Sequence, residues 1–176
     1  MSRVFVAIAL LTTAAVPLGA QQAAAPTSLS AVKQWSEAMA GNILKSAEQM
    51  PEEKFSYRPT AEVRSFGEIV GHTAGAQNMI CAIALGEQPP AEDAVEKSAT
   101  TKAALLEALK ASIAYCGKAY AMSDAHSQQP VQMFGQEMTR FGALVLNAVH
   151  NAEHYGNLVT YLRINGMVPP SSQRGM

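Results

Sequence analysis

Apolar residues recur along most of this chain at steps of three and four, the period of a helix that packs on one face. Long polar or proline-bearing connections separate the segments, and none shows the strict alternation of a β-strand. The pattern predicts an all-α protein built as a four-helix bundle. Trp35, the only tryptophan, is expected in its core. The predicted helices cover about 28–50, 65–85, 101–122 and 139–165.

The last of these helices has the clearest ends. Thr139 can cap the first turn, and Gly166 suits the left-handed position just past the last turn. Pro169 and Pro170 cannot continue a helix. The spacing therefore predicts one helix of about 26 residues, or about 40 Å at 1.5 Å per residue.

A polar stripe without charge follows one face of the last helix. Its members are Asn147, His150, His154, Asn157 and Tyr161. A face in bulk water normally carries Lys and Glu, so this composition favours a polar cleft. His150 and His154 lie one turn apart, the spacing at which two imidazoles can hold one metal ion. Two unrelated histidines on an exposed face fit the same spacing, and the pattern alone leaves both interpretations open.

The second predicted helix opens with Ser65 and Glu68 at capping-box spacing. It contains no Lys or Arg, so we expect it to be largely buried. His72 lies off its main packing stripe, on the side of Glu68. A lone helical histidine is usually structural, and by itself His72 is not assigned as a ligand. His126, in the loop 123–137, is expected to face solvent.

The first 20 residues predict a secretory signal peptide. Arg3 gives a positive start, an apolar run covers 4–16, and Ala20 is the small residue that a signal peptidase prefers before the cut. The run is short for a membrane span, and a retained N-terminal anchor is the alternative. Cleavage predicts a periplasmic or secreted protein without a membrane attachment. The predicted organisation is a signal peptide at 1–20, a linker at 21–27, a domain at 28–172 and a tail at 173–176.

Charge and cysteine content narrow the function classes. The chain carries 13 Lys and Arg against 14 Asp and Glu, a formal net charge of −1, and its basic residues are scattered. Nucleic-acid binding is therefore not expected. In an exported protein, Cys81 and Cys116 can form one disulfide that closes a loop of about 35 residues. Two small buried apolar side chains are the alternative.

Two stretches together resemble one family. SFGEIVGHTAGA around His72 and NAVHNAEHYGNLVTYLRINGMVPPSS around His150 and His154 resemble the DinB-like superfamily, including the YfiT-type metal hydrolases. The likeness is greatest to members that bear signal peptides, and it covers about 28–172. It implies an up-down-down-up four-helix bundle whose three histidines, here His72, His150 and His154, hold a divalent metal ion.

Such a ligand set is typical of a catalytic centre, because three imidazoles leave a position open for water or substrate. The catalytic group would then be a metal-bound water, whose pKa the ion lowers towards about 7. Imidazole ligands suit several metals, with Zn or Ni expected first. The residues expected to support the ligands are Glu68, Asn147, Asn157 and Tyr161, whereas Glu153 is expected to be solvated.

The resemblance implies hydrolase or thiol-transferase chemistry on an unidentified small molecule. Predicted export argues against the thiol version, because low-molecular-weight thiol cosubstrates are cytoplasmic. A non-catalytic bundle with a structural or vestigial metal site is the alternative, and a plain scaffold without metal is a third. A homodimer through a helix face is compatible with the sequence.

Overall fold

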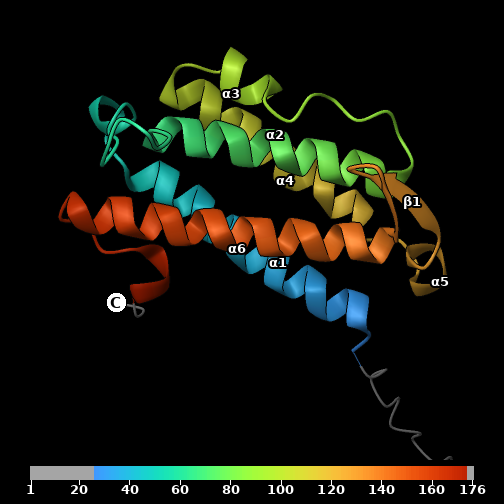
Figure 1. Cartoon of the computed structure of the whole chain (residues 1–176). Coiled ribbons are helices and arrows are strands. Elements are labelled where there is room, and N and C mark those ends of the chain that lie inside the picture. Colours follow the sequence, from blue (N-terminus) through green and yellow to red (C-terminus); the bar gives the residue numbers. More distant parts are fainter. Residues whose placement is uncertain (1–25, 174–176) are drawn as a thin grey trace, which may run out of the picture.

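The structure, a computed structural model, describes residues 26–173 and is mostly helical (Figure 1). The predicted signal peptide at 1–20 lies outside the described residues, as do 21–25 and 174–176. Four long helices make the body: α1 (Ser28–Gln49), α2 (Phe66–Leu85), α4 (Lys102–Ala119) and α6 (Arg140–Ile164). The short elements are η1 (Glu52–Lys54), α3 (Ala94–Ser98), α5 (Asp124–Ser127), β1 (Pro130–Met133), β2 (Gln136–Thr139) and η2 (Pro170–Ser172).

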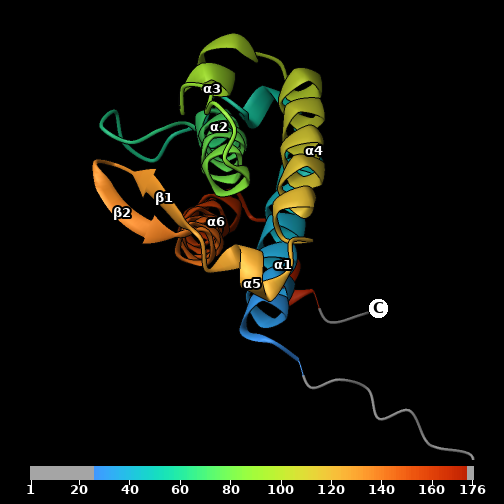
Figure 2. The same ribbon diagram turned by 90° about the vertical axis from the view of Figure 1, so that its right-hand side faces the viewer.

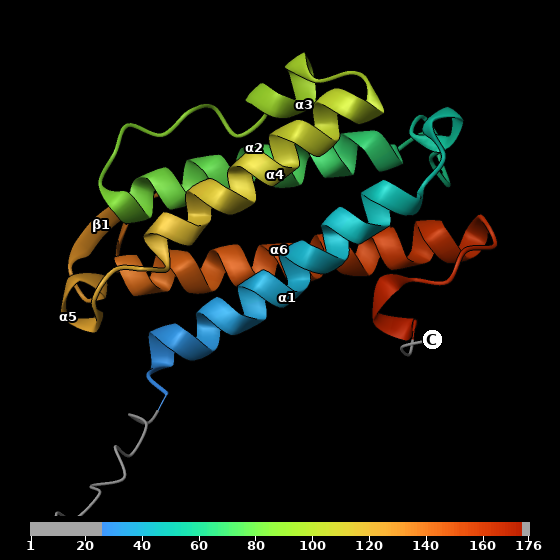
Figure 3. The same ribbon diagram turned by 180° about the vertical axis from the view of Figure 1, so that it is seen from behind.

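The four long helices lie side by side, with α2 packed against both α4 and α6, and α1 against α6. A long connection carries the chain back along α2 before α4 begins, so α2 and α4 run in the same direction (Figure 1). Seen from behind, α1 crosses α6 and α4 crosses α2 (Figure 3). Within residues 26–173, no helix combines the length and apolar character needed to cross a membrane.

Local side-chain chemistry sets the helix ends. Ser65 and Glu68 form a complete capping box at the start of α2, as the sequence predicts. The Thr139 hydroxyl accepts a hydrogen bond from the Gly142 amide at the start of α6. Gly166, just past the end of α6, has a φ of 74°, the left-handed conformation that glycine adopts without strain. These features set where α2 begins and where α6 begins and ends.

Three glycines spaced four residues apart give α2 a flat side, called the glycine face below: Gly67, Gly71 and Gly75. A Cβ atom on Gly71 would lie 2.9 Å from the Cα of Glu96, and one on Gly75 would overlap the backbone carbonyl oxygen of Glu92. The connection between α2 and α4, predicted as a polar crossover, therefore packs backbone against backbone on α2. It also contains the short helix α3, which the sequence analysis did not predict.

The prediction that no strand is present was wrong, because β1 and β2 form one antiparallel hairpin beside α6 (Figure 2). Its two-residue turn is Phe134-Gly135, with φ values of 50° and 76°. Such turns need positive φ at both positions, a requirement that glycine meets easily and phenylalanine rarely. Because Phe134 stands where such turns usually have Asn, the sequence lacks the Asn-Gly signal by which this hairpin could have been predicted.

The prediction that Trp35 is in the core was also wrong, since the residue is 67% exposed. The buried stripe of α1 lies one position further along the chain and consists mostly of small residues: Ser36, Ala40, Ile43 and Ala47. Small side chains let α1 approach α6 closely, which leaves no room between them for an indole. Trp35 instead borders an exposed apolar groove between the two helices, together with Val145 and Val149.

Candidate metal centre

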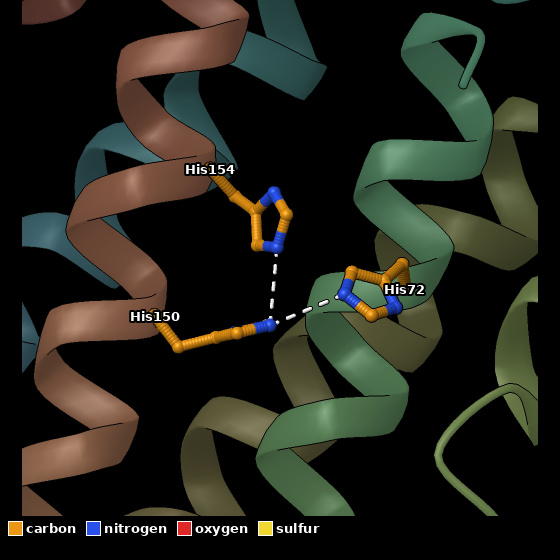
Figure 4. Close-up of side chains that lie close together, drawn as sticks. All are labelled: His72, His150 and His154. Carbon is orange, nitrogen blue, oxygen red and sulfur yellow. Dashed lines mark hydrogen bonds between the residues drawn. The ribbon is translucent and has the colours of Figure 1, made fainter. Parts of the chain in front are cut away.

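Three imidazoles meet between α2 and α6 (Figure 4). Nε2 of His150 lies 3.1 Å from Nε2 of His72 and 3.0 Å from Nε2 of His154. One potential ligand atom from each ring lies within 4.8 Å of the other two. The rings come from two helices, because His72 is on α2 whereas His150 and His154 are one turn apart on α6. The structure thus brings together the three histidines that the sequence analysis grouped.

Burial keeps these rings neutral. His72 and His154 are each 7% exposed, and His150 is half-buried. Loss of hydration lowers the pKa of His72 to about 4, and the nearby Arg64 guanidinium acts in the same direction. Burial, with the two other histidines, lowers the pKa of His154 to about 4. Burial also lowers the pKa of His150, although Glu92 and Glu153 oppose it. Neutral imidazole is the form that binds a metal ion.

The polar surroundings agree only in part with the sequence analysis. The Asn157 amide lies 3.3 Å from Nδ1 of His154, where a residue that supports a ligand is expected. Tyr161 lies on the same side of α6, but its hydroxyl donates to the backbone oxygen of Arg64. Asn157 thus contacts a ring of the cluster directly, whereas Tyr161 fixes a neighbouring loop.

Two other expected supports lie elsewhere. Asn147 is fully buried in the core, where its amide donates to the hydroxyls of Tyr120 and Ser36. The helical step from His150 back to Asn147 turns the side chain into the interior between α1 and α4. Glu68 accepts a hydrogen bond from the Ser65 amide and pairs with Arg58. Its capping role therefore holds it away from His72.

The crossover supplies two carboxylates that the sequence analysis missed. Oε2 of Glu96 lies 3.8 Å from Nδ1 of His72, and Oε1 of Glu92 lies 3.9 Å from Nε2 of the same ring. Arg64 holds Glu96 through an ion pair of 3.0 Å. One feature of the sequence could have pointed to these two residues. Glu92 and Glu96 are four residues apart, and so are Gly71 and Gly75, the two glycines on which they pack.

A cleft of about 620 Å³ lies beside the histidines, between α6 and the loop before α2. His154, Asn157 and Arg64 form part of its wall. Glu153 is exposed, as expected, yet it also lines this cleft. His126 is exposed on α5. The cleft has room for a small molecule next to the ring of His154.

The family follows from a direct comparison of the sequence. The family model described as DinB superfamily matches residues 36–158. This chain belongs to the DinB superfamily. No curated protein sequence matches it.

Solved structures share the DinB-like fold at low sequence identity. A DinB-like protein from Bacillus cereus is 16% identical, with a TM-score of 0.69, covering 82% of this chain and 97% of that one. A DinB-like protein from Bacillus subtilis is 18% identical, with a TM-score of 0.60, covering 82% of this chain and 99% of that one. A mycothiol-dependent maleylpyruvate isomerase is 15% identical, with a TM-score of 0.59, covering 76% of this chain but only 60% of that one.

Proposed function

We propose that this DinB superfamily protein binds one divalent metal ion through His72, His150 and His154 and acts on a small molecule in the adjacent cleft. The observation that carries the proposal is the convergence of three neutral ring nitrogens beside that cleft. The reaction class is that of a metal-dependent hydrolase or a thiol-transferase-like enzyme. The isomerase that shares the fold depends on a thiol, which keeps the second class in the proposal.

The side chains present fit a bound cation. Nε2 of His150 faces two other ring nitrogens at 3.0 and 3.1 Å, and each neutral ring carries only one proton to share. A cation would accept all three lone pairs at once. Nδ1 of His72 and Nδ1 of His150 are buried without a hydrogen-bond partner, so neither ring makes a hydrogen bond at that nitrogen. Imidazole ligands suit Zn or Ni among the common divalent ions.

The chain's own residues would orient the rings and the substrate. With Nε2 as the ligand atom, Nδ1 of His154 keeps its proton. The amide nitrogen of Asn157 lies 3.3 Å from that Nδ1, and a 180° turn of the amide group would bring its oxygen there to accept the proton. Arg64 lines the cleft, and the part of its guanidinium that does not pair with Glu96 through Nε would offer a cation to an anionic part of a substrate. A divalent ion at this site would supply Lewis-acid chemistry, polarising a carbonyl or phosphoryl oxygen and acidifying water.

Metal analysis of the purified protein tests the proposal. We expect about one divalent ion per chain in the wild type and loss of that ion in His150→Ala and His154→Ala. His126→Ala is the matched control, because His126 lies exposed on α5, and it should retain the metal. Equal metal content in wild type and His150→Ala would contradict the proposed site.

A non-catalytic bundle with a structural metal is the alternative function. Water exchange at the bound ion separates the two, because a catalytic centre keeps a position for water or substrate and a structural one does not. Relaxation of solvent water by the protein loaded with a paramagnetic divalent ion measures that exchange. Enhancement above that of the His150→Ala variant supports an enzyme, and no enhancement supports the structural role.

Two further proposals concern context. We infer that residues 1–20 direct export to the periplasm or the medium, and N-terminal sequencing should find Gln21 first in the mature protein. We also infer an up-down-down-up four-helix bundle, a proposal supported by the parallel course of α2 and α4. A homodimer stays a prediction that the apolar groove beside Trp35 supports.

A further inference from the structure

Glu92 stands out among the carboxylates around the histidines because of the ring atom it approaches. Its Oε1 lies 3.9 Å from Nε2 of His72, the nitrogen that also faces His150. Ligand atoms about 2.0–2.2 Å from a zinc ion lie about 3.4 Å from one another in a tetrahedral site. The distance from Glu92 to His72 is therefore about half an ångström longer than between two zinc ligands, and a rotation of the 42% exposed Glu92 side chain would be needed to bring its carboxylate near the other two rings as well.

The backbone of the crossover is seated where such a ligand is needed. Gly75, three residues after His72, leaves the space that the carbonyl of Glu92 occupies, and a side chain there would overlap that oxygen. Gly71, one residue before His72, likewise accommodates the backbone of Glu96. The glycine face thus sets the backbone of residues 92–96 against the turn of α2 that carries His72.

Charge pairing points to the same residue. Among the described residues, Glu96 is paired with Arg64, Glu68 with Arg58, and Asp93 with Lys97. The ion pair recorded for Glu92 is with His72 alone, and its side chain is 42% exposed, so no cation holds it away from the centre. A carboxylate added to three neutral imidazoles also offsets half the charge of a divalent ion.

We propose that Glu92 is a fourth protein ligand, which completes a three-histidine, one-carboxylate centre. The inference rests on the proposed metal site and deepens it. Such a set fills the four positions that zinc prefers, and water or substrate from the cleft would enter as a fifth ligand or by displacing the carboxylate, so exchange of water at the ion still marks a catalytic centre. Glu92 then controls access to the metal from the crossover side.

Cobalt substitution tests this assignment, because the visible spectrum of Co²⁺ reports its coordination number. In the wild type we expect the intense bands of a four-coordinate ion. In Glu92→Gln we expect the weaker bands of a five-coordinate ion, because two water molecules enter where the carboxylate leaves, and an affinity lowered by at least about tenfold, the least that supporting residues alone are worth. Asp93→Asn removes a charge from the neighbouring position and should leave both readouts unchanged.

A variant that displaces the backbone of the crossover gives a second, independent test of the role of Glu92. Gly75→Ala should push the crossover off α2 and shift the Co²⁺ spectrum in the same direction as Glu92→Gln, while circular dichroism shows the helices intact. If Co²⁺ binds and Glu92→Gln matches the wild type in spectrum and affinity, the role of Glu92 is overturned and the three-histidine site stands. If the wild type binds no Co²⁺, the proposed function fails, and this inference fails with it.

Discussion

His72 has a different environment at each ring nitrogen. Nε2 faces the other histidines, whereas Nδ1 is buried without a hydrogen bond and lies 3.8 Å from Oε2 of Glu96. Arg64 fixes that carboxylate from its other oxygen. An N–H at Nδ1 directed at Glu96 would leave the lone pair on Nε2, which is the tautomer that a metal ligand needs.

Replacement of Glu96 by Gln should therefore weaken metal binding. We expect an affinity about 10–100-fold lower, with the same coordination number, because the ring is less well oriented and no ligand is removed. Titration calorimetry with Zn²⁺ measures the affinity. Glu68→Ala is the contrasting variant: it should leave the affinity unchanged and lower the free energy of unfolding by about 1 kcal/mol through loss of the capping box. Equal affinities in Glu96→Gln and wild type would contradict the positioning role.

Residue spacing put His150 and His154 on one face, whereas His72 was grouped with them only through the family resemblance, and of the expected supports only Asn157 contacts a ring. His150 and His154 are four apart on one helix, so their common face follows from helix geometry alone. Asn147 and Asn157 both share the polar stripe, yet only Asn157 reaches a ring. A stripe at steps of three and four drifts around the helix, and whether its end lies in a cleft or in the core depends on where α1 and α4 pack. Sequence periodicity contains no information on that packing.

At the scale of elements, the glycine face explains why the crossover was not predictable. Residues 87–101 are polar and proline-bearing, which is typical of a solvated loop. What places them is the absence of side chains on α2 at Gly71 and Gly75, a feature of the partner helix. The α3 segment is only five residues long, so it owes its order to this contact and not to helix propensity.

A disulfide provides a second link between elements, since Cys81 of α2 and Cys116 of α4 are bonded, with their Cα atoms 5.3 Å apart. Their separation of 35 residues implies a loop-closure contribution of about 3–4 kcal/mol to the free energy of unfolding. In the Cys81→Ala, Cys116→Ala double variant, the free energy of unfolding measured by urea titration should be lower by that amount. Its metal affinity should match the wild type, because neither cysteine contacts the histidines. A loss of under about 1 kcal/mol would show that the cross-link adds little.

At the scale of the molecule, the candidate metal centre lies within the seam between α2 and α6, and its burial affects overall stability. The three neutral histidines make the folded state less stable in acid, because the unfolded chain then binds protons that the folded chain excludes. The pKa values of His72 and His154 are about 4 in the folded protein, against 6.5 ordinarily. Above pH 6.5, both states carry neutral rings and these groups have no effect.

The free energy of unfolding of the metal-free protein should therefore fall as the pH drops from about 6.5 to about 4, with a slope of up to about two protons taken up on unfolding. Below about pH 4 the contribution of these rings levels off, because both states are then protonated. Urea titrations in the presence of a chelator, repeated across pH 7 to 4, measure the slope. Carboxylates also contribute to the loss of stability in acid. Glu68 is one example, because hydrogen bonds from Ser65 lower its pKa in the folded protein.

A His72→Gln, His154→Gln variant isolates the histidine part, since it keeps every carboxylate and removes two of the three buried rings. Its stability should change less between pH 6.5 and 5 than that of the wild type, whereas His126→Gln, altered at an exposed position, should follow the wild type. Parallel curves for the double variant and the wild type would mean that the rings already take up protons in the folded state. Protons would then occupy the lone pairs that a metal ion requires, and metal binding would weaken below pH 6.5 instead of persisting towards pH 4.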